Sequence, residues 1–302
     1  MSLSMSFSAS ASASASTSAS TSAATSASLS AIAVNSGGPV PPARIDLAAA
    51  PRGTFDPADE KLRAAATTFE RALTASTVEE EEALWTVVIQ SCERAGNAEW
   101  VPDIASRALG NRGNARSRQG RLVEALEDYN AAIAYAPYAV DPVLNRGVAL
   151  ESLGRFQEAA ADYSAVLAVS PNDPAAWNNL GNAQAGVGAW GDAVKSYRRA
   201  TMLAPAFSFA AANYALALYE VGNDNAAIKQ MRSLLRKYPE FPDMRAALAV
   251  ALYAAGLRAE AETAWSRVDD GRYRDREWVS EYRRWPPRLV SELAAFLDLK
   301  PV

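Results

Sequence analysis

Most of the chain is patterned for helices, because apolar side chains recur every third or fourth residue with polar residues between them. Residues 56–96 carry two such apolar stripes in succession, which predicts a helical hairpin. Asp56 and Pro57 offer an N-cap and a first-turn proline for its first helix. Thr77 and Glu80 have the spacing of a capping box, so the second helix is expected to begin there.

From residue 106 to 273 the pattern repeats with a period of about 34 residues, and positions are counted from 106, 140, 174, 208 and 242. Position 15 is always glycine: Gly120, Gly154, Gly188, Gly222, Gly256. Position 20 is always alanine: Ala125, Ala159, Ala193, Ala227, Ala261. Position 8 is small: Gly113, Gly147, Gly181, Ala215, Ala249. Position 24 is large: Tyr129, Tyr163, Tyr197, Met231, Trp265.

Each recurring residue type has a physical role in a helix–turn–helix unit. Small residues at positions 8 and 20 let two helices approach closely, and the large residue at position 24 fills space toward the neighbouring unit. Glycine at position 15 supplies the left-handed residue that ends the first helix. Position 32 is proline in the first four units, and proline cannot continue the second helix.

These residues at this spacing resemble the tetratricopeptide repeat (TPR) family. The resemblance implies an all-α fold, an α–α superhelix (solenoid) of about five units: 106–139, 140–173, 174–207, 208–241 and 242–273. The end units of a solenoid must cover an apolar surface, so we expect capping helices in residues 54–105 and 274–302. Departures from the family's pattern are Arg112 and Arg116 in the first unit and Val166, Leu234 and Val268 at position 27, so we expect less regular packing at the ends.

The composition excludes most catalytic chemistry. The chain has no histidine and one cysteine, Cys92, so neither a Ser-His-Asp triad nor a zinc site of His and Cys ligands can be built. No phosphate-binding glycine motif is present. We therefore expect no enzyme, cofactor or metal, with a carboxylate-based hydrolase as the alternative. Cys92 lies in an apolar stripe and is expected to be buried, a redox role being the alternative.

Residues 1–53 have a different composition, with mostly Ser, Thr and Ala at first and no charged residue before Arg44. A Ser-rich, acid-free leader is typical of an organelle transit peptide, and the missing arginines favour a chloroplast over a mitochondrion. We expect this segment to be disordered and removed between about Ala33 and Gly53, leaving the protein in the chloroplast stroma. A retained low-complexity tail is the alternative.

The most apolar runs, 206–219 and 244–257, are shorter than the ~20 residues of a bilayer span. We expect no integral membrane segment, so any contact with the thylakoid membrane would be peripheral. The net charge of −4 argues against nucleic acid as the main partner.

The resemblance also implies that first helices line a concave surface, with positions 2, 5, 6, 9, 12 and 13 facing inward. Asparagines recur at positions 6 and 9: Asn111, Asn114, Asn145, Asn179, Asn182, Asn213. A side-chain amide both donates and accepts hydrogen bonds, so such a ladder could bind the backbone of an extended peptide. The alternative is that these amides only satisfy neighbouring groups within the fold.

One partner of the family can be compared residue by residue. TPR cochaperones bind the C-terminal carboxylate of heat-shock chaperones with three cations and two asparagines. The best matching window here is Gly110, Asn114, Asn145, Ala175, Asn179. Both amides are present and all three cations are missing, so we do not expect this carboxylate clamp.

A second candidate surface lies near the C-terminus, where Trp278, Tyr282 and Trp285 have helical spacing before Pro286. An end cap explains them, and an aromatic docking surface is the alternative. Six arginines against three acids over 272–288 give the segment a weak resemblance to a base-stacking surface.

The expected function is a non-catalytic protein–protein interaction scaffold in the chloroplast. Chloroplast TPR proteins of similar layout assist the assembly or maintenance of thylakoid photosynthetic complexes, photosystems especially. The alternative within the binding class is an adaptor in organelle RNA metabolism or chaperone work. The client protein is not identified by any residue of this sequence.

Overall fold

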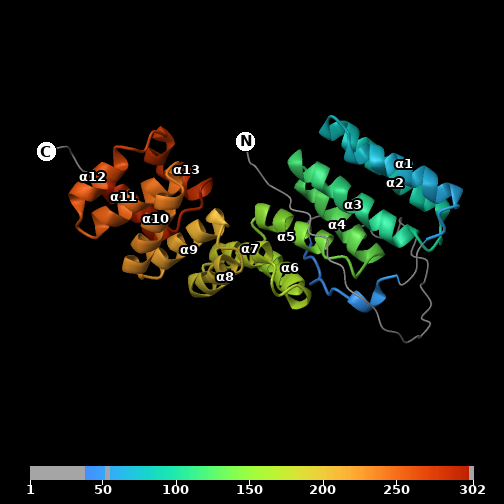
Figure 1. The fold of residues 1–302 in the computed structure, drawn as a ribbon, viewed down its shortest axis with the longest axis horizontal. Helices are drawn as coiled ribbons and strands as arrows, with labels where there is room; N and C mark the ends of the chain where they lie inside the picture. The colour runs from blue at the N-terminus through green and yellow to red at the C-terminus, as the bar shows by residue number, and fades with distance from the viewer. Residues whose placement is uncertain (1–37, 52–54, 299–302) are drawn as a thin grey trace. The chain divides into compact units, whose positions relative to one another are not determined.

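The computed structural model describes residues 38–51 and 55–298, and Figure 1 draws the other residues as a thin grey trace. Within these ranges the regular elements are all helical. The α-helices are α1 Glu60–Leu73, α2 Val78–Ala95, α3 Val101–Arg118, α4 Leu122–Tyr135, α5 Asp141–Ser152, α6 Phe156–Val169, α7 Pro174–Gly186, α8 Trp190–Leu203, α9 Ser208–Glu220, α10 Asp224–Lys237, α11 Pro242–Ala254, α12 Arg258–Trp265, α13 Arg276–Glu281 and α14 Pro287–Leu297. Two short 3₁₀ helices, η2 Leu47–Ala49 and η3 Gly271–Arg274, accompany them.

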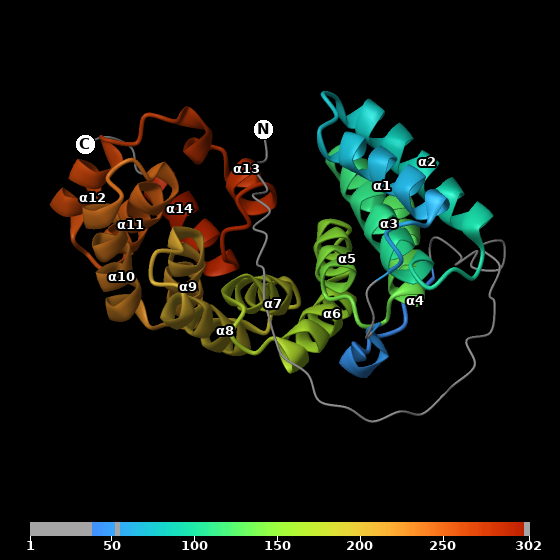
Figure 2. The same cartoon turned by 45° about the vertical axis from the view of Figure 1, so that its right-hand side comes forward.

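Consecutive helices pack against one another from α1 to α12, as Figures 1 and 2 show. Helices α3 to α12 form the five expected pairs, in which α3, α5, α7, α9 and α11 are the first helices. First helices also contact the first helix of the next pair, as α5 and α7 do. This layered packing of helical pairs is a TPR solenoid, the expected fold class. Helix α3 begins at Val101, ahead of the unit boundary expected at 106.

The glycine at position 15 ends each first helix as expected. All five adopt positive φ angles between 75° and 82°. A side chain would clash with the backbone in that conformation, whereas glycine adopts it freely. A regular turn between the two helices of each pair follows from this one residue type.

The small residue at position 8 accommodates the ring at position 24 of its own unit. A Cβ placed on Gly147 would lie 2.6 Å from Cε1 of Tyr163, and one on Gly181 would lie 2.6 Å from Cε1 of Tyr197. The tyrosine therefore lies against the glycine of its own unit, and not only toward the neighbouring unit as the spacing suggested. In the fourth unit, position 8 is alanine and position 24 is methionine.

The arginines of the first unit, where less regular packing is expected, are bound by acidic side chains. Arg112 Nη2 lies 2.6 Å from Asp128 Oδ1, and Arg116 Nη1 lies 3.0 Å from Asp128 Oδ2. The second unit repeats the pair, because Arg146 Nη2 lies 2.6 Å from Asp162 Oδ1. Arg112–Asp128 and Arg146–Asp162 join positions 7 and 23, and Arg116–Asp128 joins positions 11 and 23, so each pair connects the two helices of one unit.

The hairpin of α1 and α2 covers the first unit. Its core includes Trp85 and Cys92, both buried, and Phe69 packs edge-on against Trp85 with ring centroids 4.7 Å apart. Burial raises the pKa of the Cys92 thiol to about 12, which disfavours the reactive thiolate. The N-cap of α1 is Asp59, so the start expected from Asp56 and Pro57 was wrong by a few residues.

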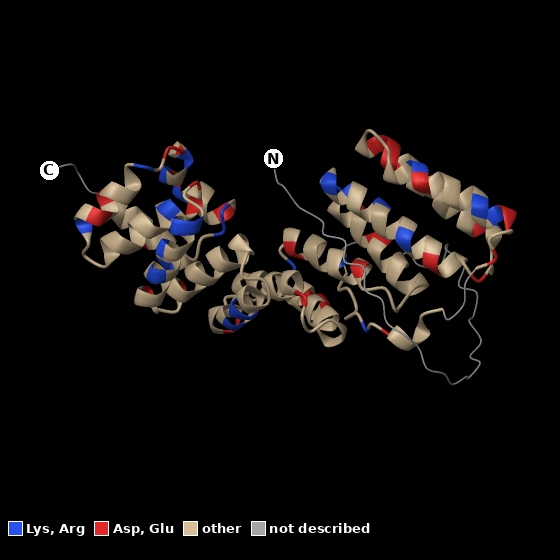
Figure 3. Cartoon of the chain, in the orientation of Figure 1, with Lys and Arg blue, Asp and Glu red and all other residues tan. Residues whose placement is uncertain are grey.

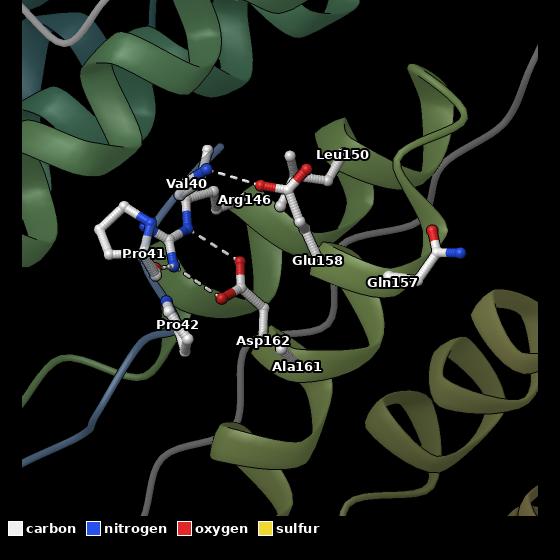
Figure 4. Close-up of a pocket in the computed structure, with 9 residues that line it drawn as sticks. All are labelled: Val40, Pro41, Pro42, Arg146, Leu150, Gln157, Glu158, Ala161 and Asp162. Carbon is white, nitrogen blue, oxygen red and sulfur yellow. Dashed lines mark hydrogen bonds and ion pairs between the residues drawn. The ribbon is translucent and has the colours of Figure 1, made fainter. Parts of the chain in front are cut away.

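Residues 38–46 form an extended segment, here called the N-terminal strap, which packs on α5 and α6 (Figure 4). Val40 is buried, and its backbone N–H donates to Glu158 Oε2 at 2.6 Å. Arg155 Nη2 donates to the Gly38 carbonyl at 2.8 Å, and Arg146 Nη2 donates to the Pro41 carbonyl at 3.1 Å. The expectation of a disordered leader extending to residue 53 therefore does not hold for 38–51, and residues 1–37 lie outside the described part.

The strap is held mainly through its backbone. Pro39, Pro41 and Pro42 lack an N–H group, so from residue 39 to residue 42 Val40 is the one backbone donor and the other backbone groups are carbonyls. The segment ends at Asp46, whose N–H donates to the Pro137 carbonyl at 2.9 Å.

Among the described helices, none has both the length and the apolar character needed to cross a membrane.

Candidate functional site

The first helices α3, α5, α7 and α9 carry the predicted asparagines, and we call the surface they share the first-helix face. All six side chains are half-buried: Asn111, Asn114, Asn145, Asn179, Asn182, Asn213. The structure gives them two different kinds of surroundings. Three take part in hydrogen bonds that hold the fold together, and three have weak bonds or none within the described residues.

The asparagines at position 9 accept hydrogen bonds from the tyrosines at position 24. Tyr129 donates its hydroxyl hydrogen to Asn114 Oδ1 at 2.8 Å, and Tyr197 donates to Asn182 Oδ1 at 2.9 Å. Each bond satisfies a hydroxyl at the end of a buried ring. Asn114 and Asn182 therefore have a structural role that their side chains already fulfil.

Asn213 joins two units of the solenoid. Its Nδ2 donates to Asn178 Oδ1 at 3.1 Å and to Asn182 Oδ1 at 3.2 Å, both on the preceding first helix. Asn178 was not among the predicted site residues, although it occupies an inward-facing position. Asn213 is thus a bridge between α9 and α7.

Asn111, Asn145 and Asn179 at position 6 remain available for a partner. Within the described residues, the amides of Asn111 and Asn145 make no side-chain hydrogen bond, and Asn179 accepts only a long one of 3.4 Å from Asn178. They stand on three successive first helices at the same position of the repeat. Their donors and acceptors can therefore exchange water for the backbone of a bound chain.

Glu151 is a charged group on the same face that the sequence reading did not select. Its side chain is 12 % exposed, and it lies at position 12 of the second unit. Glu151 Oε2 accepts a hydrogen bond from the Tyr163 hydroxyl at 3.2 Å. Burial raises the pKa of Glu151, while the charge of Arg284 acts in the opposite direction. Glu151 could have been selected from the sequence, because position 12 is one of the positions expected to face inward.

The C-terminal segment does not present its three aromatic residues on one surface. Trp285 is 3 % exposed and donates from Nε1 to Asp243 Oδ1 at 3.0 Å, whereas Tyr282 is 74 % exposed. Trp278 is half-buried and packs edge-on against Tyr273 with centroids 5.2 Å apart. Helix α13 ends at Glu281, so Trp285 lies beyond it and the expected continuous helical spacing is absent.

Arginines of this segment bind acidic groups on the repeats. Arg283 Nε lies 2.9 Å from Asp243 Oδ1, and Arg288 Nη1 lies 2.6 Å from Asp224 Oδ1. Helix α14 packs against α9 and α11, so the segment covers the first helices of the last two units (Figure 2). Figure 3 shows Lys and Arg gathered on α10 and around α13, and part of that charge is neutralised by these contacts.

The described residues hold no group of three acidic or cysteine side chains placed to bind a metal ion. The acidic side chains with the strongest burial, Asp128 and Asp162, are each paired with an arginine. Both pairs join the two helices of a unit, and Arg146 and Asp162 also line the pocket drawn in Figure 4. The chemistry that the first-helix face offers is hydrogen bonding by amides and ion pairing by Glu151.

Comparison with known proteins identifies the repeats. A profile described as a TPR repeat matches residues 149–188, and one described as a tetratricopeptide repeat matches 213–273. No curated protein sequence matches the chain.

Solved structures with the same fold have low sequence identity. A tetratricopeptide repeat protein from Parabacteroides merdae superposes with a TM-score of 0.59 at 15 % identity, covering 78 % of this chain and 98 % of that chain. MamA from Desulfovibrio magneticus, residues 41 to the end, superposes with a TM-score of 0.52 at 16 % identity, covering 59 % of this chain and 94 % of that chain. The chain therefore contains tetratricopeptide repeats folded into an α-helical solenoid.

Proposed function

We propose that this protein is a non-catalytic scaffold that binds proteins or extended peptides on the first-helix face. The observation that carries the proposal is the row of amides at position 6, Asn111, Asn145 and Asn179, on three successive first helices. These amides lack strong partners within the described residues, unlike Asn114 and Asn182. A partner's backbone would supply both the donors and the acceptors that they need.

The proposed compartment is the chloroplast stroma, with the thylakoid membrane as a peripheral contact. The support is the composition of the leader, which is rich in Ser, Thr and Ala and has no acidic residue before Asp46. In that compartment the proposed role is to assist assembly or maintenance of photosynthetic complexes. We further propose that any cleavage occurs before Gly38, because cleavage after this residue would remove a backbone carbonyl to which Arg155 donates a hydrogen bond.

Binding is tested by replacing Asn111, Asn145 and Asn179 together with alanine. Each amide contributes only about 0.5–1.5 kcal/mol net, so the three should cost about 1.5–4.5 kcal/mol in client binding if they add. That corresponds to roughly a ten- to thousandfold loss of affinity. The measurement is quantitative mass spectrometry of proteins that co-purify from chloroplast extracts with the wild type and with the variant.

The matched control replaces Asn97 and Asn223, two exposed asparagines in connecting turns, with alanine. The control should keep all clients. The triple variant should keep the circular-dichroism melt of the wild type, since its three substitutions lie within helices, where alanine is a better helix former than asparagine. A folded triple variant that retains its clients would show that the amides do not bind them. Mass spectrometry of the mature N-terminus tests the compartment, and intact Met1 on cytosolic protein would contradict import.

A further inference from the structure

Glu151 on the first-helix face is paired with a cation of the same chain. Its carboxylate is largely removed from water and accepts the Tyr163 hydroxyl hydrogen bond. An ionised carboxylate in such surroundings is costly unless a positive group is paired with it. Phe156, at the start of α6, adds an aromatic face beside the same point.

The cation beside Glu151 is Arg284. Arg284 reaches this carboxylate from the turn after α13, and its Nη1 lies 2.9 Å from Glu151 Oε1. Its guanidinium carbon lies 6.0 Å from the centroid of the Phe156 ring, at the limit for a cation–π contact. The side chain of Arg284 is still 53 % exposed, so water can compete for its remaining donors.

Arg284 is placed there by contacts and not by its own backbone preference. Among the described residues it is the one non-glycine with a positive φ, 54°. That conformation is unfavourable for a side-chain-bearing residue, so surrounding contacts must maintain it. The residues before and after Arg284 hold the backbone in place. Arg283 pairs with Asp243, and the buried Trp285 donates a hydrogen bond to the same carboxylate. The Arg284 side chain can therefore leave Glu151 by rotation while the rest of the segment stays docked.

We propose that the Glu151 carboxylate, which accepts the Tyr163 hydrogen bond and has Phe156 beside it, is a binding site for an arginine side chain of the client, and that Arg284 occupies this site in the client's absence. The proposal rests on the proposed function, since the client's backbone would lie along the amides of the same face. A planar guanidinium suits the site better than an ammonium, because it pairs with a carboxylate and stacks on a ring at once. Arg284 then acts as a tethered competitor that sets the affinity for arginine-bearing clients.

The test uses a dye-labelled nonapeptide of alanines with one central arginine, and the same peptide with citrulline, which keeps the shape but lacks the charge. Fluorescence anisotropy measures their binding to the full chain and to Arg284→Ala. Removing the competitor should strengthen binding of the arginine peptide several-fold, because the fraction of free sites rises. The arginine peptide should bind Arg284→Ala about ten- to a hundredfold more tightly than the citrulline peptide.

The double variant Glu151→Gln, Arg284→Ala should lose the preference for arginine over citrulline. Arg276→Ala is the matched control, since it removes an exposed arginine from α13, and it should bind both peptides as the wild type does. Circular-dichroism melts confirm that each variant is folded.

Two outcomes would overturn the proposal. One is the absence of saturable binding of the arginine peptide to folded Arg284→Ala, and the other is an arginine preference that survives Glu151→Gln. If either occurs while clients still depend on the three position-6 asparagines, the arginine site is wrong and the scaffold function stands. If client binding is also independent of those asparagines, both proposals fail.

Discussion

Tyr197 and Asn182 are joined by a hydrogen bond of 2.9 Å between the tyrosine hydroxyl and the amide oxygen, and the same bond joins Tyr129 to Asn114. The two pairs occupy the same positions in the third and first units. This recurrence explains why asparagine stands at position 9 without any need for a ligand. It also separates the asparagines of the face into structural ones and available ones.

The first prediction concerns this bond. Tyr197→Phe removes the buried hydroxyl, and we expect the free energy of unfolding to fall by about 0.5–1.5 kcal/mol. Tyr282→Phe is the control, because its exposed ring should tolerate the same change without effect. Urea unfolding followed by circular dichroism measures both variants. An unchanged midpoint for Tyr197→Phe would mean that the bond contributes nothing to stability.

The second prediction concerns the contact between Gly147 and the ring of Tyr163. Gly147→Ala should destabilise the protein, because overpacking costs about 1–3 kcal/mol. In a Tyr163→Met background, which copies the residue pair of the fourth unit, the ring is gone and the same change should stabilise by up to about 1 kcal/mol through helix propensity. Thermal melts of the wild type, both single variants and the double variant measure this reversal. If Gly147→Ala changed the stability in the same direction in both backgrounds, the proposed coupling between residues 147 and 163 would be ruled out.

The third prediction concerns the buried pair of Arg146 and Asp162, whose side chains are 3 % and 1 % exposed. Arg146→Met would leave the Asp162 carboxylate without its cation, and breaking a buried pair in this way costs about 3–5 kcal/mol. Lys195→Met is the matched control, because its pair with Asp192 lies at the surface and contributes at most about 1 kcal/mol. Chemical unfolding should show a larger loss of the free energy of unfolding for Arg146→Met than for Lys195→Met. Equal losses would contradict a stabilising role for the buried pair.

The fourth prediction concerns the pH dependence of the N-terminal strap. Hydrogen bonds from Arg155 lower the pKa of Glu158, burial acts in the opposite direction, and the Val40 N–H lowers it further. Because the folded pKa lies below the ordinary value of about 4.3, the contribution of Glu158 is complete above that pH and is lost as the pH falls through the folded pKa. We therefore expect the strap to be held at neutral pH and to loosen in acid.

Glu158→Gln removes the charge at neutral pH and tests the same contact. Hydrogen exchange followed by mass spectrometry should show a loss of protection in peptides that contain Val40, whose N–H donates to Glu158. Glu127→Gln, a substitution of another glutamate on a second helix, serves as the control and should leave the strap protected. Undiminished protection in Glu158→Gln would show that the carboxylate does not hold the strap.

The sequence by itself determined the number of helical pairs and the turn within each pair. The reason is that these features depend on local chemistry that recurs: a glycine at position 15 must adopt positive φ, and small residues must stand where helices cross. A repeated local rule is visible as periodicity. The asparagines at positions 6 and 9 could be identified from the sequence for the same reason. The sequence did not indicate which of their amides are hydrogen-bonded within the fold and which are not.

The tertiary structure decided what covers the solenoid. Arg284 and Glu151 stand 133 residues apart, and Arg146 binds the Pro41 carbonyl 105 residues away. Each of these contacts occurs once, so it leaves no periodic pattern in the sequence. The sequence also does not distinguish a helical carboxylate that is solvated from one that is paired with a cation. The tertiary fold brings an arginine that is distant in sequence close to a buried carboxylate. Because leaving that carboxylate unpaired would be costly, the two side chains form an ion pair.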